Sequence, residues 1–161
     1  MKAWLAIALL ACGAAAHAFS GVVTRVSDGD TLWVRPDPAT HAEHAKPVKL
    51  RLQGLDAPEH CQPGGPQAQA ALESRVLHRR VQVTTRATDD YGRRIGQLWL
   101  HGEDVGTWMV LHGHAWSQRY RRSAGPYAAQ EQQARAARRG VFAPGDALEP
   151  WEFRRRYGAC R

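Results

Sequence analysis

The sequence predicts an α+β fold that is rich in β-structure. Five short runs of β-branched and aliphatic residues recur along the chain, and polar residues alternate with the apolar ones in several of them. Helix-like segments follow the third run and the last one. A chain of 161 residues can bury one hydrophobic core, and its 43% hydrophobic and 23% charged residues are typical of a globular protein.

The first half of the chain contains three of the predicted strands. The β-rich runs 22–26 and 31–34 are joined by a segment with Asp28-Gly29, a dipeptide typical of hairpin turns. A polar loop is expected over 36–47, and the alternating run 48–52 is the third strand. A helix is expected to begin at Pro66, because proline suits the first turn of a helix.

The second half contains two more strands and two more helices. Runs 81–85 and 95–100 flank an Asp-Asp-Tyr-Gly turn, and helical patterns cover 104–111 and 127–138. Five strands with one helix inserted after the third and others at the end predict a five-stranded OB-fold-like barrel with about three helices.

The N-terminal residues resemble a secretory signal peptide. A positive start is followed by a short apolar run, and Ala16-His17-Ala18 supplies the small residues that precede a cleavage site. We therefore expect residues 1–18 to be removed before Phe19 and the protein to be exported, to the periplasm or beyond. The apolar run is too short to span a membrane. In the alternative, residues 9–12 are a lipoprotein box and a lipid on Cys12 anchors the protein.

The mature chain is expected to be one domain, residues 19–161, with its core at 22–142 and a C-terminal extension at 143–161. Once Cys12 is removed, Cys61 and Cys160 remain, an even pair in an oxidising compartment. We predict that they form a disulfide that holds the C-terminus beside the 56–61 loop. Two unrelated thiols, or pairing between molecules, are the alternatives.

The positive charge is concentrated at the C-terminal end. The formal net charge is +7, and only three of the 22 basic residues are lysines. Residues 19–118 carry 11 basic and 11 acidic side chains, whereas 119–161 carry ten arginines against four acids. This excess suits a polyanion such as nucleic acid, and a guanidinium can bind a phosphate through two parallel hydrogen bonds. A solvated basic surface is the alternative.

Three short motifs carry candidate chemistry. They are Asp28-Gly29-Asp30-Thr31, the string from Arg51 to Glu59, and Asp89-Asp90-Tyr91-Gly92-Arg93. Each of them alone is compatible with a turn or a charged surface loop. If their carboxylates converge, each like-charge pair at ~4 Å costs about 1 to 4 kcal/mol. A cation relieves that repulsion, and an all-oxygen donor set suits a hard ion such as Ca²⁺.

Two arginines belong to the same motifs. Arg51 and Arg93 would face the place where the carboxylates meet. Arginine and a metal ion around an acidic base can hold a phosphodiester and stabilise the charge that develops on it.

The three motifs, in this order and at this spacing, resemble the staphylococcal nuclease (thermonuclease) family. The resemblance runs from about Val22 to Phe142. It includes the ending Gly140-Val141-Phe142, where the family has a similar Gly/Asn-Ile-Trp close to its last helix. The joint set of motifs is far more specific than any one of them.

The resemblance implies a role for each matching residue. One Ca²⁺ ion would be held by Asp30, Asp56 and the backbone carbonyl of Ala57. Asp28 would support these ligands without binding the ion itself. Glu59 would activate or orient the attacking water. Arg51 and Arg93 would clamp the scissile phosphate.

Further residues would contact the nucleotide. The resemblance assigns Tyr91 to this role. Arg119 and Arg121 stand where the best-known family member has tyrosines, and Tyr120 lies between them. These three residues could contact the nucleotide in either of two ways, by stacking on a base or by binding a phosphate.

We therefore expect a Ca²⁺-dependent, monomeric endonuclease of the micrococcal nuclease type. The resemblance implies hydrolysis of DNA and RNA with little sequence preference, by cleavage of the P–O5′ bond to leave 3′-phosphates. The alternative is a non-catalytic OB-fold module that binds nucleic acid, against which the acidic residues beside the phosphate site argue. No pattern in the sequence indicates an inhibitor protein as a partner.

Overall fold

The computed structural model describes residues 17–38 and 46–160. The expected signal segment up to residue 16, with Cys12, therefore lies outside the described residues. So do residues 39–45 of the expected polar loop.

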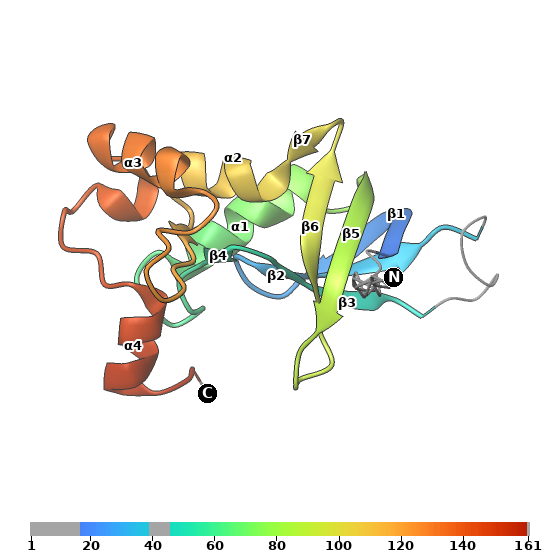
Figure 1. The fold of residues 1–161 in the computed structure, drawn as a ribbon, viewed down its shortest axis with the longest axis horizontal. Coiled ribbons are helices and arrows are strands. Elements are labelled where there is room, and N and C mark those ends of the chain that lie inside the picture. The colour runs from blue at the N-terminus through green and yellow to red at the C-terminus, as the bar shows by residue number, and fades with distance from the viewer. Residues whose placement is uncertain (1–16, 39–45, 161) are drawn as a thin grey trace, which may run out of the picture.

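Five strands close into a barrel (Figure 1). They are β1 (His17–Val26), β2 (Thr31–Pro36), β3 (Val48–Leu52), β5 (Arg80–Thr88) and β6 (Arg94–Leu100). Their order is β3-β2-β1-β5-β6, and a parallel pairing between β3 and β6 closes the barrel. The other neighbours in this barrel are antiparallel. The predicted five-stranded, OB-fold-like α+β architecture is thus confirmed.

The barrel interior is filled by alternating aliphatic side chains. Val23, Leu32, Leu50, Val83 and Leu98 are each at most 1% exposed and come from the five different strands. This is the period-2 pattern by which strands of a small barrel place every second side chain inside.

Three two-residue strands complete the β-structure. β7 (Glu103–Asp104) pairs antiparallel with β6, and β4 (Leu55–Asp56) pairs with β8 (Trp116–Ser117). Asp56 lies opposite Trp116 in that second pair. The sequence pattern did not predict these strands, because two residues cannot show a period. The β4–β8 pair matters for function because it fixes the backbone of Asp56.

Helices cover one side of the barrel. They are α1 (Gly65–Val76), α2 (Val105–Leu111), α3 (Ala128–Ala136), the short 3-10 helix η1 (Gly140–Phe142) and α4 (Pro150–Tyr157). Figure 1 shows the four α-helices on the same side of the β5–β6 hairpin. Among the described residues, no helix is both long and apolar enough to cross a membrane.

Helix α4 was not predicted. Its residues belong to the C-terminal extension, for which the sequence indicated only a disulfide. Two boundary signals were present: Pro150 occupies the first turn, and Gly158 with φ 80° follows the last turn. The helix was missed because its eight residues include three consecutive arginines, and its apolar face is limited to Pro150, Phe153 and Tyr157.

Strand β1 begins before the expected cleavage point. His17 and Ala18 pair with Thr85 and Thr84 of β5, and Phe19 packs against the barrel core. Cleavage before Phe19 would remove the first two pairs of this ladder and leave Phe19 as the first residue of the strand. The signal peptide remains a prediction.

The structure contains a disulfide between Cys61 and Cys160, whose Cα atoms are 5.8 Å apart. Cys61 follows β4, and Cys160 lies three residues beyond the end of α4. The bond therefore joins segments 99 residues apart in the sequence.

Replacing both cysteines with serine is expected to lower the free energy of unfolding by about 2 to 5 kcal/mol, because the unfolded chain gains freedom when this long loop is open. Urea unfolding of the two proteins measures the difference, and intact mass shows whether the wild-type chain lacks two hydrogens relative to its reduced form. Wild-type protein with two free thiols after purification from an oxidising compartment would contradict the pairing.

His112 and His114 stack around Trp108 at the end of α2. Their ring centroids lie 4.5 Å and 5.5 Å from that of Trp108. Burial lowers the pKa of His114 below its ordinary 6.5, and the neighbouring His112 lowers it further. The folded chain therefore favours neutral His114.

This shift makes stability depend on pH. A histidine with a lowered folded-state pKa stabilises the fold above its ordinary pKa, and that contribution is lost as the pH falls through the lowered value. The wild-type Tm is therefore expected to fall more steeply between pH 7 and pH 5 than the Tm of His114→Gln. Thermal unfolding followed by circular dichroism at several pH values tests this. Equal slopes for the two proteins would show that His114 is not responsible.

Candidate active site

Five segments meet at one end of the barrel and line a pocket of about 390 Å³. They are the β1–β2 turn, strand β3, the loop after β4, the β5–β6 hairpin and α4. The charged side chains that line it are Asp28, Asp30, Arg51, Glu59, Arg93 and Arg154. The sequence predicted the first five of these as site residues, and the fold brings them together.

Asp30 and Asp56 share one guanidinium. Arg51 Nη1 pairs with Asp30 Oδ2, and Arg51 Nη2 lies 3.0 Å from Asp56 Oδ1. Asp30 is 4% exposed and Asp56 is 7% exposed. The backbone N–H of Ala57 also donates to Asp30 Oδ2, at 3.1 Å. Two nearly buried carboxylates are thus held within the width of one arginine side chain.

Two glycines allow these segments to come close. A Cβ atom on Gly29 would lie 2.7 Å from the Cβ of Ala57 and 2.8 Å from that of Ala68. A Cβ atom on Gly65 would lie 2.0 Å from the carbonyl oxygen of Glu59. Any larger residue would push the β1–β2 turn or α1 away from the loop that carries Asp56 and Glu59.

Asp28 supports the turn from behind. Its Oδ1 accepts the backbone N–H of Asp30 at 3.0 Å. Burial raises the pKa of Asp28 above its ordinary value, while the charge of Arg51 and a hydrogen bond from Thr31 act in the opposite direction. Through its hydrogen bonds with Asp30 and Thr31, Asp28 therefore fixes the turn that carries Asp30.

Glu59 stands on a loop that Gln62 holds in place. The backbone N–H of Glu59 donates to Gln62 Oε1 at 3.2 Å, and the backbone N–H of Gln62 donates to the Glu59 carbonyl at 2.8 Å. Gln62 is 3% exposed, and its Nε2 donates to the Leu148 carbonyl at 2.7 Å. The Glu59 side chain is 26% exposed and faces the pocket.

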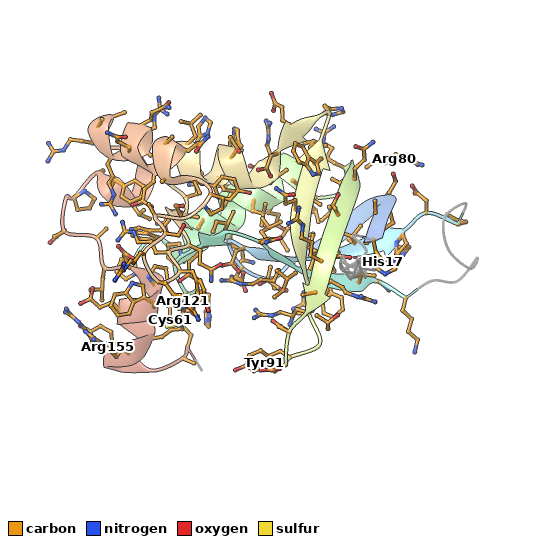
Figure 2. The ribbon with its side chains drawn as sticks, viewed as in Figure 1. His17, Cys61, Arg80, Tyr91, Arg121 and Arg155 are labelled. Atoms are coloured by element: carbon orange, nitrogen blue, oxygen red, sulfur yellow. A yellow bond between two sulfur atoms is a disulfide. The ribbon has the colours of Figure 1, made fainter. Side chains whose placement is uncertain are left out.

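Arg93 is oriented by Asp89 at the base of the β5–β6 hairpin tip. Its Nε lies 2.7 Å from Asp89 Oδ2. Asp89 Oδ1 accepts the backbone N–H groups of Tyr91 and Arg93. Tyr91 is 84% exposed, and the Arg93 guanidinium carbon lies 5.4 Å from the centre of its ring. Figure 2 shows Tyr91 at the tip of the hairpin, away from the barrel.

The predicted nucleotide contacts Arg119, Tyr120 and Arg121 do not line this pocket. Arg119 pairs with Glu131 at 3.3 Å and with Glu149 at 2.8 Å. It lines a neighbouring hollow of about 310 Å³, which also contains Asp56 and Arg154. Tyr120 is 70% exposed, with the Arg121 guanidinium carbon 5.3 Å from the centre of its ring.

Sequence reasoning missed Arg154. Its Nη1 lies 2.6 Å from Glu59 Oε1, and its Nη2 lies 3.0 Å from Asp56 Oδ2. Burial acts to lower the pKa of Arg154, but hydrogen bonds with Asp56 and Glu59 outweigh this and raise it above its ordinary value. The predicted disulfide already placed the C-terminus beside the 56–61 loop, and that was the available signal for a basic residue here.

Part of the C-terminal positive charge stabilises the fold. Arg135 Nε lies 2.8 Å from Glu131 Oε1, whose residue is 4% exposed, and the guanidinium carbon of Arg135 lies 4.4 Å from the ring centre of Phe142. Arg139 donates to the carbonyl of Leu111 at 2.8 Å. Their neutralisation would therefore affect stability, so they are unsuitable as simple probes of nucleic-acid binding.

The donor atoms fit a hard divalent cation. Asp30 and Asp56 offer carboxylate oxygens, and the carbonyl of Ala57 follows directly in the chain. Among residues 17–38 and 46–160, no group of three or more His, Cys, Asp or Glu side chains could hold a metal ion. A cation here would therefore add carbonyl and water oxygens to two carboxylates, as Ca²⁺ and Mg²⁺ do, whereas zinc sites use nitrogen and sulfur. Arg51 between the two carboxylates shows that the place accommodates positive charge.

Comparison with known proteins gives a consistent picture. Residues 49–143 match the family described as "Staphylococcal nuclease homologue". The chain is also 33% identical over 150 residues to a "Micrococcal nuclease" of Shigella flexneri, with 85% of this chain and 81% of that protein covered. An "Uncharacterized endonuclease" of Escherichia coli O157:H7 is 34% identical over 137 residues, 84% of this chain and 85% of that protein.

One similar protein has a name of another kind. "Protein ParB" of Escherichia coli is 37% identical over 167 residues, which cover 96% of this chain and 90% of that protein. This alignment extends over nearly the whole chain, whereas the family match begins at residue 49 and leaves out the turn that carries Asp28 and Asp30.

Proposed function

Because the chain belongs to the staphylococcal nuclease family, we propose that it is a Ca²⁺-dependent endonuclease that hydrolyses phosphodiester bonds of DNA and RNA with little sequence preference. The observation that carries this proposal is the pocket that Asp30, Arg51, Glu59 and Arg93 line together, with Asp56 paired to Arg51 beside it. A protein that only binds nucleic acid gains nothing from acidic groups beside its phosphate site.

The chain's own residues supply most of the chemistry. Glu59, held by Gln62, orients the attacking water and takes up its proton as the water oxygen bonds to phosphorus. The P–O5′ bond breaks, the leaving 5′ oxygen takes a proton from solvent water, and the phosphate stays on the 3′ oxygen. Glu59 then returns its proton to solvent. A Ca²⁺ ion at Asp30, Asp56 and the Ala57 carbonyl would polarise a phosphate oxygen as a Lewis acid.

Arg51 and Arg93 bind the scissile phosphate. Each guanidinium presents parallel N–H groups that match two phosphate oxygens, and their attraction grows as negative charge accumulates in the transition state. Asp89 fixes the direction of Arg93 through its Nε. Asp28 keeps the turn that carries Asp30 in place.

Exposed residues around the pocket are assigned to the rest of the nucleic acid. Tyr91 stacks on a base next to Arg93. Arg119, Tyr120 and Arg121 follow β8 and contact the strand further along, by phosphate contact or stacking. The proposal includes a single exported, monomeric domain over 19–161, and the Cys61–Cys160 disulfide supports export because such bonds persist in oxidising compartments.

The test is digestion of plasmid DNA and single-stranded RNA by the purified mature chain. We expect both to be degraded with Ca²⁺ and neither with a chelator. The products should carry 3′-phosphates, so that a polymerase extends them only after phosphatase treatment. Tight binding without cleavage in any divalent ion would instead identify the non-catalytic binding module.

A further inference from the structure

Helix α4 carries an arginine into the pocket from outside the barrel. Arg154 contacts both Asp56 and Glu59, which precede it by 98 and 95 residues in the sequence. It lines the same pocket as Arg51 and Arg93 and is 39% exposed. The guanidinium is therefore in reach of a ligand that enters from solvent.

The helix is held against the pocket at both of its ends. Before it, Gln62 binds the carbonyl of Leu148, and Arg119 pairs with Glu149. After it, Cys160 is bonded to Cys61, two residues beyond Glu59. The loop that positions Glu59 thus also fixes the segment that carries Arg154.

A contribution to stability alone does not account for this arrangement. An ion pair whose arginine is partly exposed to solvent, as Arg154 is, adds little to stability. Asp56 and Glu59 are also the two acids that the proposed function needs for the cation and the water. Arg51 pairs with Asp30 and Asp56 in the same manner, and it is the residue proposed to bind phosphate.

The charge balance indicates what Arg154 is for. The lining of the pocket together with Asp56 has four carboxylates and three guanidiniums, and so a formal charge of −1. A divalent cation makes this +1, and one phosphodiester then makes it zero. Without Arg154 the loaded pocket would carry an uncompensated negative charge. That charge would oppose the further negative charge that develops during hydrolysis.

We propose that Arg154 is a third phosphate-binding arginine of this active site, delivered by α4 and kept in place by the Cys61–Cys160 disulfide. The inference rests on the proposed function and extends it to a residue of the C-terminal extension. When the carboxylates of Asp56 and Glu59 serve the cation and the water, the guanidinium turns its N–H groups to a phosphate oxygen of the substrate.

Binding of an uncleavable substrate analogue tests this without catalysis. The probe is a labelled single-stranded oligonucleotide in which CH₂ replaces each O5′, which keeps the phosphate charge and removes the bond that breaks. With Ca²⁺ present, Arg154→Gln is expected to weaken binding about ten- to one-hundredfold, the effect of losing one charge-assisted contact. The salt dependence of log K should fall by about 0.7 for one phosphate contact on a single strand.

Matched variants separate this role from general charge and from folding. Arg155→Gln removes the same charge from the same helix, where Arg155 is 67% exposed and pairs with Glu152, and it should change affinity far less. Arg154→Lys keeps the charge but loses the two-pronged contact and should fall between wild type and Arg154→Gln. Thermal unfolding of each variant checks that α4 and the barrel remain folded.

The disulfide allows a second, independent experiment on the same proposal. Replacing both cysteines with serine should lower kcat/KM, though by no more than Arg154→Gln does, because the C-terminal end of α4 is released while its N-terminal end stays fixed. In the Arg154→Gln background the same replacement should cause little further loss.

Two results would overturn the inference. Affinity for the analogue unchanged in Arg154→Gln would remove Arg154 from phosphate binding. Faster cleavage by Arg154→Gln would show that the arginine instead blocks the site. Both results presuppose a wild-type chain that cleaves nucleic acid, and a wild-type chain that cleaves none overturns the proposed function together with this extension.

Discussion

Replacing Glu59 with glutamine is expected to lower kcat by about one hundred- to ten-thousandfold, the usual contribution of a positioned acid or base. Glutamine has nearly the same shape but cannot take a proton from water. The backbone hydrogen bonds with Gln62 do not involve the Glu59 side chain, so the loop should keep its position. Affinity for nucleic acid should change little, because the phosphate contacts are assigned to arginines.

Single-turnover cleavage and binding to the uncleavable analogue measure the two effects separately. Glu73→Gln on the exposed side of α1 makes the same chemical change away from the pocket and should be silent. Near-normal turnover by Glu59→Gln would remove Glu59 from the mechanism. Equal losses of turnover and affinity would indicate that the loop had moved.

Replacing Arg93 with lysine is expected to lower kcat by about one hundred- to one-thousandfold, as for loss of one preorganised donor to the transition state. Lysine retains the positive charge but has no Nε–H for Asp89 and cannot bind two oxygens at once. The loss should appear mainly in kcat, because the contact strengthens as charge develops on the phosphate.

Arg94→Lys is the matched control, since Arg94 is the next residue and is exposed. Steady-state kinetics on one oligonucleotide with Ca²⁺ present compare the two variants. A silent Arg93→Lys would refute its place in the phosphate clamp. If only KM changed, Arg93 would bind the substrate and the transition state equally well and would not contribute to the chemical step.

The barrel and most of the pocket could be predicted from the sequence because their signals are local. Alternation of apolar residues marks the strands, and Asp28-Gly29 marks the first hairpin. Asp30 directly precedes β2 and Asp56 follows the end of β3 by four residues, so the antiparallel pairing of β2 with β3 brings them close together. Helix boundaries differed by a few residues: α3 covers 128–136, where the pattern indicated 127–138.

Long-range ion pairs leave no such local pattern. Arg154 meets Asp56 across 98 residues, and only the predicted pairing of Cys61 with Cys160 indicated that the two segments lie close together. The repulsion expected among the converging carboxylates was attributed to a missing cation. In the structure two guanidiniums, those of Arg51 and Arg154, already offset part of it. Repulsion among the carboxylates therefore does not establish that a metal ion is bound. The argument for the ion is its proposed role in polarising a phosphate oxygen during hydrolysis.

The most direct measurement is the rate of cleavage of one labelled oligonucleotide as a function of Ca²⁺ concentration, for the wild-type chain and for Asp56→Asn. The account predicts no cleavage in chelator, a rate that rises to a plateau with Ca²⁺ in the wild type, and a much higher Ca²⁺ requirement in Asp56→Asn. Cleavage that continues in chelator, or the same Ca²⁺ dependence in both proteins, would contradict a cation site at Asp30 and Asp56.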